Sequence, residues 1–395
     1  MLKEKQFIYC DNAATTQTRQ EVTKLLAEID NESFGNSSSL HHYGQKAKNL
    51  LETSRETIAK FINAEPSEIY FTRSGTEANN LAILGLTDKV KSLNSNQKHI
   101  ITSSIEHSSV DLPMKKLEAE GWQITRLNVD EEGFIDFEQL EREVSEHTLL
   151  VSIIHGNNEI GTIQDIKRIA DLCKKHNVLF HSDTVQSIGK VPVDVKEQGV
   201  DFLSISGHKV YAPKGVGVLY IKKGVSISPL FWGGGQEGNL IPGTENIPGI
   251  AGLAKAIDLR TEEMFSEAQR LKEIQQIFFD ELIGISGIQL NGSRDLEKRI
   301  PGNINLSFDE IKGDVAILRL NLMGVCASSG SACSSGSIEP SKVISALYPN
   351  RLPEECNWAA NSIRLSFGLF NTREEALFVL DSIKKLSLQF SSLKR

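Results

Sequence analysis

The chain has 395 residues, of which 39% are hydrophobic and 24% are charged, proportions that are ordinary for a soluble enzyme. Its formal net charge of −8 argues against a dedicated nucleic-acid-binding surface, so no direct nucleic-acid contact is expected. No apolar run reaches the roughly 18 residues needed to span a bilayer, and the polar N-terminus does not resemble a signal peptide. We therefore expect a cytoplasmic protein with more than one domain and no membrane association.

In chain order, the predicted elements begin with alternating helices and strands. They are a helix over residues 46–64, a strand over 68–72, a helix over 77–93, strands over 99–104 and 149–155, a helix over 166–176, and strands over 178–183, 202–206 and 216–222. Because the strands are almost continuously apolar, they favour a buried, largely parallel sheet. The predicted class is α/β with a doubly wound sheet, in which ligands bind beyond the carboxyl ends of the strands.

The pattern changes after about residue 252, which indicates a second, smaller α+β domain. The predicted elements there are a long helix to about residue 283, strands over 304–308 and 362–366, and helices over 314–322 and 373–388. The segment 324–340 is small, polar and rich in serine and glycine, which predicts a mobile loop.

The five cysteines are odd in number, sparsely spaced and without a Cys-x-x-Cys pair. This spacing argues against a disulfide framework and against a metal site. Most single cysteines are small buried hydrophobic residues. Cys333 differs because it lies in the predicted mobile loop, where an accessible thiol can visit a site and leave it. Cys326 follows an apolar residue and is expected to be a packing residue.

Lys209 is the most informative single residue, although a lone lysine is usually a solvated surface charge. It ends the run Ser-Ile-Ser-Gly-His-Lys directly after a predicted strand, and Asp183 closes another strand. A lysine that forms a Schiff base and an acid that keeps a pyridine nitrogen protonated are what a pyridoxal 5'-phosphate (PLP) site needs. Ser206 and His208 supply donors suited to its phosphate. The alternative for Asp183 is a helix N-cap.

Further candidates follow other predicted strands. Gly75 and Thr76 lie at a helix start, where free N–H groups favour phosphate, although Thr76 could equally be a plain N-cap. His107 could stack on a cofactor ring and move protons, or be a structural histidine. Asn158 could support the ring or form a turn, and Gln186 could reach the ring's phenolic oxygen.

Arg364 lies between apolar residues in the predicted strand 362–366. An arginine in that position is typical of a bidentate carboxylate clamp, and a structural ion pair is the equal alternative.

Taken together, these segments resemble the cysteine desulfurases, PLP enzymes of the aspartate aminotransferase fold. The resemblance runs nearly end to end and rests on residues 11–16, 35–36, 75–80, 106–107, 157–161, 181–186, 206–209, 233–235, 243–246, 328–333 and 362–364. The run Ser-Ser-Gly-Ser-Ala-Cys at 328–333 marks the long-loop group of the family.

The resemblance implies PLP fold type I, with a mostly parallel seven-stranded sheet and a homodimer. The large domain would span residues 16–260, and the small domain would combine 1–15 with 261–395 and carry the catalytic-cysteine loop at about 324–340.

The resemblance also implies residue roles in converting L-cysteine to L-alanine. Lys209 would hold PLP and shuttle the α-proton, His107 would stack on the ring, and Cys333 would take the sulfur as a persulfide. Asn36 and Arg364 would bind the substrate carboxylate. The remaining PLP contacts would be Gly75, Thr76, Asn158, Asp183, Gln186, Ser206 and His208, with Thr244 reaching the phosphate of the partner subunit.

The sulfur would then pass to an acceptor protein for iron–sulfur cluster assembly or thiolation. One alternative is a selenocysteine lyase or another PLP β-elimination enzyme. Another is a catalytically silent homologue that acts as a scaffold. Two departures from the family pattern motivate the silent alternative: Arg73 stands before the phosphate turn, and Ile241 stands where the family usually has an arginine.

Overall fold

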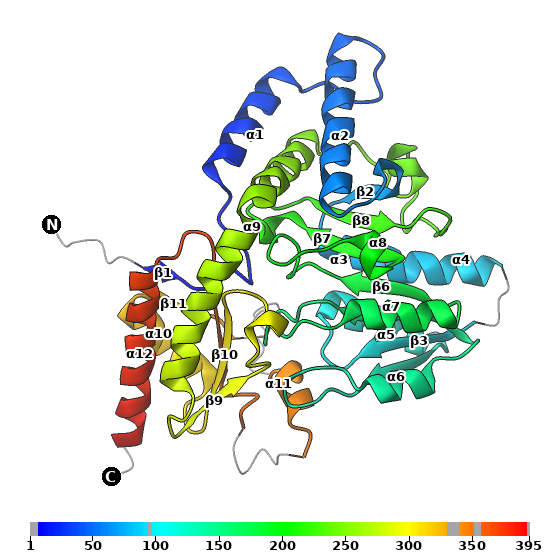
Figure 1. The fold of residues 1–395 in the computed structure, drawn as a ribbon. Helices are drawn as coiled ribbons and strands as arrows, with labels where there is room; N and C mark the ends of the chain where they lie inside the picture. The colour runs from blue at the N-terminus through cyan, green and yellow to red at the C-terminus, as the bar shows by residue number, and fades with distance from the viewer. Residues whose placement is uncertain (1–6, 94–96, 330–339, 351–356, 393–395) are drawn as a thin grey trace.

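The computed structural model describes residues 7–93, 97–329, 340–350 and 357–392. Its centre is a seven-stranded sheet with the order β2-β8-β7-β6-β5-β3-β4 (Figure 1). The strands are β2 (Ile69–Thr72), β3 (His99–Ser103), β4 (Gln123–Leu127), β5 (Thr148–Ile154), β6 (Leu179–Asp183), β7 (Phe202–Ser206) and β8 (Gly217–Ile221). β8 runs antiparallel to both of its neighbours, and the other adjacent pairs are parallel. The predicted mostly parallel sheet is confirmed.

Helices cover both faces of this sheet, because successive strand side chains alternate between two apolar clusters. One cluster joins the sheet to α1 (Gln20–Glu32), α2 (His42–Phe61), α6 (Phe137–Glu143), α7 (Ile166–Lys175), α8 (Val195–Gln198) and the first part of α9 (Ile247–Leu282). The other joins it to α3 (Gly75–Asn80), α4 (Leu86–Ser92) and α5 (Ser108–Ala119). In β7, Leu203 faces the first cluster and Phe202 faces the second. This is the doubly wound arrangement that the apolar strands predicted.

Two local differences from the predicted elements have physical causes. The helix predicted over 77–93 consists of α3, a π-helical segment (Leu81–Gly85) and α4. A Cβ on Gly85 would lie 2.6 Å from the carbonyl oxygen of Ser228, so the helix packs too closely there for a larger residue. The strand β4 was not predicted, because it lies at the sheet edge and its sequence, Gln-Ile-Thr-Arg-Leu, is mixed in polarity.

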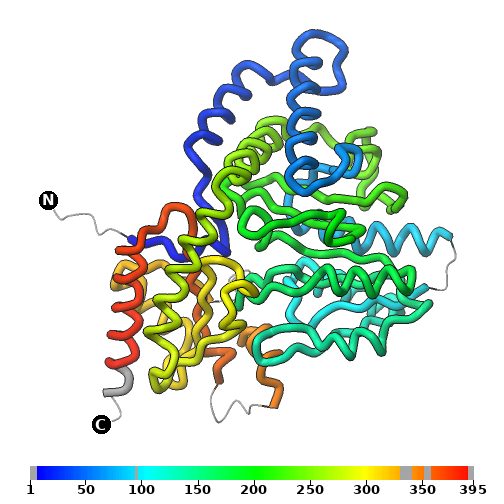
Figure 2. Tube along the Cα trace, viewed as in Figure 1, coloured from blue at the N-terminus to red at the C-terminus, as the bar shows by residue number. Residues whose placement is uncertain are grey.

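The second part of the molecule is built on α9, which crosses from one half to the other (Figures 1 and 2). Ile257 of α9 belongs to the core of the large sheet, whereas Leu271 packs in a separate core. That core contains α10 (Gly313–Met323), α12 (Arg373–Ser392) and a three-stranded antiparallel sheet of β9 (Ile288–Asn291), β10 (Asn303–Phe308) and β12 (Ser362–Ser366). α11 (Lys342–Leu347) packs in a small cluster of its own with Ile105 and Ile160.

The N-terminal strand β1 (Ile8–Tyr9) pairs in parallel with β11 (Val325–Cys326), and Ile8 packs in the same core as α10 and α12. The switch of α9 between cores supports a division near residue 260, which stays a prediction. In the described residues, no helix combines the length and apolar character required to cross a bilayer.

Candidate active site

The carboxyl ends of β5, β6 and β7 open onto a cavity of about 180 Å³. Ten of the residues singled out in the sequence line it: Gly75, Thr76, His107, Asn158, Asp183, Gln186, Ser206, His208, Lys209 and Arg364. They come from both halves of the chain, and they meet here because neighbouring parallel strands end at the same edge of a sheet.

Lys209 lies in a 3-10 turn directly after β7, and only 8% of the residue is exposed. Its Nζ donates to the carbonyl oxygens of Ala13 and Ala14, the latter at 2.7 Å. The Ala13-Ala14 segment is held against this turn by a further bond of 2.8 Å from the Thr16 hydroxyl to the His208 carbonyl. The N-terminal segment thus forms one wall of the cavity and fixes the lysine amine beside it.

Asp183 ends β6 and is 3% exposed. Its carboxylate accepts 2.9 Å and 2.7 Å hydrogen bonds from the backbone N–H of Val185 and the side-chain amide of Asn79. Both donors are neutral, so they stabilise the carboxylate without neutralising it. A buried carboxylate in this setting suits a cationic partner in the cavity, such as the protonated ring nitrogen of PLP.

The phosphate end of such a cofactor has a fitting cradle between α3 and β7. A Cβ on Gly75 would lie 2.7 Å from Val185 Cγ2 and 3.2 Å from Ser206 Cβ, so only glycine leaves this space open. Ser74, not Thr76, caps α3, because its hydroxyl accepts from Glu77 N at 3.2 Å. The Thr76 side chain therefore does not serve as the cap, and it lines the cavity instead.

Arg364 forms the structural ion pair that was one of the two roles considered for it, and its role as a carboxylate clamp stays a prediction. Its side chain is 3% exposed, and NH2 forms a 2.8 Å ion pair with Asp11 Oδ1. NH1 donates to the carbonyl oxygen of Asn158 at 3.0 Å, and the buried Nε has no hydrogen-bond partner within the described chain. The structural ion pair therefore exists, and Nε is the buried donor that a carboxylate ligand would satisfy.

Gln186 is oriented by two contacts that the sequence did not reveal. Its Nε2 donates to the Ala13 carbonyl at 2.8 Å, and its Oε1 accepts from Lys190 Nζ at 3.2 Å. Because the Ala13 carbonyl oxygen can only accept, it selects the amide orientation that directs Nε2 toward it. Burial, aided by the charge of Lys209, lowers the pKa of Lys190 to about 7.

Burial keeps several groups around the cavity neutral. It lowers the pKa values of His181 and His208 to about 4, and the charge of Lys209 contributes at His208. Burial also raises the pKa of Glu106 to about 8, although its Oε1 accepts a 3.0 Å bond from Ile154 N. When Glu106 is protonated, it carries no negative charge that would repel the Asp183 carboxylate.

Three of the predicted site residues are not among the described residues that line this cavity. Cys333 lies outside the described residues. Asn36 and Thr244 do not line the cavity; each is adjacent in sequence to one member of a hydrogen bond of 2.8 Å between Ser37 Oγ and Glu245 Oε2. Their predicted roles at the carboxylate and at the partner's phosphate stay predictions.

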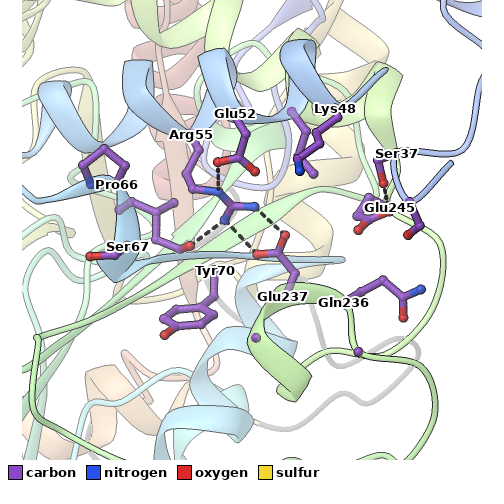
Figure 3. Close-up of a pocket in the computed structure, with 15 residues that line it drawn as sticks. Ser37, Lys48, Glu52, Arg55, Pro66, Ser67, Tyr70, Gln236, Glu237 and Glu245 are labelled. Carbon is purple, nitrogen blue, oxygen red and sulfur yellow. Dashed lines mark hydrogen bonds and ion pairs between the residues drawn. The ribbon is translucent and has the colours of Figure 1, made fainter. Parts of the chain in front are cut away.

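That hydrogen bond lies at a second cavity of about 700 Å³ between α2 and the segment around Glu237 (Figure 3). Arg55 donates from NH1 and NH2 to the two carboxylate oxygens of Glu237, at 2.9 Å and 2.7 Å. The Glu237 carboxylate also accepts from Phe71 N at 2.7 Å, which ties this segment to β2.

The two departures from the family pattern, Arg73 and Ile241, lie in different surroundings. The Arg73 side chain is 67% exposed and points to Glu77, with a distance of 3.6 Å between Nε and Oε1. Ile241 is buried in the apolar cluster with α3, α4 and α5. Neither residue lines the cavity, so the structure gives no sign that Arg73 crowds the phosphate cradle.

Comparison with known proteins agrees with this geometry. Residues 8–378 match the aminotransferase class-V family. The chain is 47% identical to cysteine desulfurase IscS of Dictyoglomus turgidum, over 97% of this chain and 95% of that protein. It is 41% identical to putative cysteine desulfurase IscS 1 of Bacillus subtilis, over 96% of this chain and 99% of that protein.

Among solved structures, a NifS-like protein superposes with a TM-score of 0.88 at 35% identity, covering 98% of this chain and 100% of that one. SspA in complex with cysteine superposes with a TM-score of 0.79 at 34% identity, covering 92% of this chain and 99% of that one. The chain therefore belongs to the aminotransferase class-V family and, within it, to the cysteine desulfurases, which are PLP-dependent enzymes.

Proposed function

We propose that this enzyme converts L-cysteine to L-alanine and moves the sulfur to Cys333, which passes it to an acceptor protein. The observation that carries the proposal is the convergence of Lys209, Asp183 and Arg364 on one cavity. An amine, a buried carboxylate and a partly unpaired guanidinium there match the three needs of an amino-acid substrate on PLP: covalent attachment, ring charge and carboxylate binding.

PLP, when bound, supplies an electron sink that stabilises negative charge at the substrate's α-carbon. Lys209 would hold it covalently and, once displaced by the substrate amine, would take the α-proton on Nζ. Asp183 would face the ring nitrogen, Gln186 the phenolic oxygen and His107 the ring face. Thr76, with Gly75, Ser206 and His208, would hold the phosphate.

The sulfur step belongs to Cys333 in this proposal. Its thiolate would attack Sγ of the substrate, so that a sulfur–sulfur bond forms while the Cβ–Sγ bond breaks and its electron pair returns to the substrate. The thiolate is the reactive form, and a thiol of ordinary pKa near 8.5 is mostly protonated at neutral pH. Cys333 would therefore be activated within the cavity, and the loop would carry the persulfide out to the acceptor.

A homodimer is part of this proposal, because Thr244 would serve the partner's phosphate site. Large apolar side chains are exposed close in sequence to the second cavity: Phe34 is 68% exposed and Trp232 is 86% exposed. Phe34 stacks on Tyr43, with ring centroids 5.0 Å apart. Exposed aromatic groups of this kind are typical of protein interfaces.

Membership of the cysteine desulfurases favours an active enzyme over the silent scaffold. The alternative that the substrate is selenocysteine, and the enzyme a selenocysteine lyase, stays open. A direct lyase would not need Cys333. The acceptor, whether for iron–sulfur assembly or thiolation, and the cytoplasmic location stay predictions.

The test is the pair Cys333→Ser and Cys326→Ser, each given ³⁵S-labelled cysteine. Cys333→Ser should keep the visible absorbance of lysine-bound PLP, lose labelled persulfide on the protein and release alanine at well below the wild-type rate. Cys326→Ser is the matched control, and it should match the wild type in all three measurements. Alanine release by Cys333→Ser at the wild-type rate with dithiothreitol would refute the assigned role and favour a direct lyase.

A further inference from the structure

One buried amide joins two residues of the cofactor cavity. Asn79 lies in α3 and is 0% exposed. Its Nδ2 donates to Asp183 Oδ2 at 2.7 Å and to Ser109 Oγ at 2.8 Å. Ser109 Oγ in turn lies 2.7 Å from His107 Nδ1. The residue expected at the ring nitrogen and the residue expected at the ring face are therefore linked through one side chain.

The direction of each hydrogen bond in this chain follows from groups that can only donate or only accept. The backbone N–H of Ser109 lies 3.2 Å from His107 Nδ1 and must donate, so Nδ1 is an acceptor. The Ser109 hydroxyl then donates to Nδ1 and accepts from Asn79. The Asp183 carboxylate accepts the second amide hydrogen. His107, when neutral, is thus fixed in the tautomer that carries its proton on Nε2.

The position is not explained by packing alone. Asn79 Oδ1 is buried and has no hydrogen-bond partner in the part of the chain that the structure describes. A buried amide oxygen without a partner is destabilising. An apolar side chain of similar size would fill the same space without that penalty. What an apolar residue could not supply is the pair of N–H donors.

We propose that Asn79 is a positioning residue for the desulfurase reaction, whose amide holds Asp183 for the cofactor's ring nitrogen and, through the Ser109 hydroxyl, orients the imidazole of His107. The inference rests on the proposed roles of Asp183 and His107. Asn79 does not line the cavity itself, so it acts through these neighbours. Within the described chain, the adjacent Asn80 donates only to backbone carbonyl oxygens, of Thr76 at 2.9 Å and of Ser109 at 3.4 Å. It hydrogen-bonds to neither Asp183 nor the Ser109 hydroxyl, which makes it a matched control.

The experiment compares Asn79→Ala, Ser109→Ala and Asn80→Ala in the full-length, PLP-loaded enzyme. The readouts are the pH titration of the visible absorbance of lysine-bound PLP, and kcat and KM for alanine release. Asn79→Ala should shift the absorbance titration and lower kcat roughly ten- to hundredfold, the range for losing a hydrogen bond to a charged group, with KM nearly unchanged.

Ser109→Ala should lower kcat less and leave the absorbance titration unchanged, because Asp183 keeps its amide donor. Asn80→Ala should match the wild type in both readouts. The Asn79→Ala/Ser109→Ala double variant should have the kcat of Asn79→Ala within about twofold, because the Ser109 hydroxyl is held toward His107 only while the Asn79 amide donates to it. A kcat that falls by the product of the two single effects would overturn that link.

Asn79→Leu keeps the volume and removes both donors, so it carries the same expectation if Asn79→Ala does not fold. Wild-type titration and kcat in either folded variant would overturn the inference while leaving the proposed function standing. A wild-type enzyme without the absorbance of lysine-bound PLP would instead refute the proposed function itself.

Discussion

The cofactor cavity and the second cavity, beside Glu237, differ in how their buried charges are satisfied. In the cofactor cavity, Asp183 is buried with neutral N–H donors as its hydrogen-bond partners, and Arg364 keeps one buried N–H that no group in the described part of the chain accepts. In the second cavity, the buried charges of Arg55 and Glu237 are paired with each other in a doubly hydrogen-bonded ion pair (Figure 3). Buried polar groups that are only partly satisfied indicate a place for a ligand, whereas a closed ion pair indicates a structural support.

Cavity volume alone would have selected the second cavity, rather than the cofactor cavity, as the candidate active site. The second is about 700 Å³, whereas the cofactor cavity is about 180 Å³. The smaller cavity has the chemistry because strand ends and helix starts direct donors and acceptors into it. The larger one lies beside segments that carry exposed aromatic residues, where a partner subunit is proposed to pack.

The largest expected effect is on the cofactor cavity. Lys209→Ala removes the covalent attachment and the proposed proton carrier, so alanine formation should fall by at least about 10³-fold. The absorbance of lysine-bound PLP should disappear at the same time. Lys214→Ala is the matched control, because Lys214 is exposed and lies outside the cavity. Retained activity in Lys209→Ala would break the assignment of the site.

A different outcome is expected when the second cavity is changed. Arg55→Met keeps much of the side-chain volume but leaves the buried Glu237 carboxylate unpaired, which should reduce the free energy of unfolding by about 3 kcal/mol. The residual enzyme should still show lysine-bound PLP. Urea unfolding followed by circular dichroism measures the first effect, and the absorbance spectrum measures the second. Loss of the cofactor without loss of stability would reverse the roles assigned to the two cavities.

The smallest effect concerns the neutral histidines near the cofactor cavity. Burial lowers the pKa of His155 to about 4, below the ordinary value of 6.5. Between pH 6.5 and 4 the unfolded chain therefore binds a proton that the folded chain does not, and this group's contribution to stability is lost as the pH falls. The variant His155→Gln should show a shallower decline in unfolding free energy than the wild type over that range.

His147→Gln is the control for this measurement, because the His147 side chain is 70% exposed. It should follow the wild-type decline. Equal slopes for His155→Gln and the wild type would show that the proton uptake comes from elsewhere in the molecule.

By itself, the sequence determined the sheet and the strand-end residues of the site. Apolar runs that close on a polar residue are local patterns, and the strands ending at Asp183 and Ser206 formed where they were expected. The edge strand β4 and the π-helical segment after α3 were not predicted, because the local sequence pattern does not show a position at the sheet edge or close backbone packing.

Only the tertiary structure decided which distant residues complete the site. The Ala13 carbonyl meets Lys209, the Asp11 carboxylate meets Arg364, and the Asn79 amide meets Asp183. Each pair is separated by about a hundred residues or more, so its contact depends on the packing of whole elements rather than on local propensity. The physical reason is that secondary structure follows from nearby side chains, whereas the partners of buried polar groups are selected when the core closes around them.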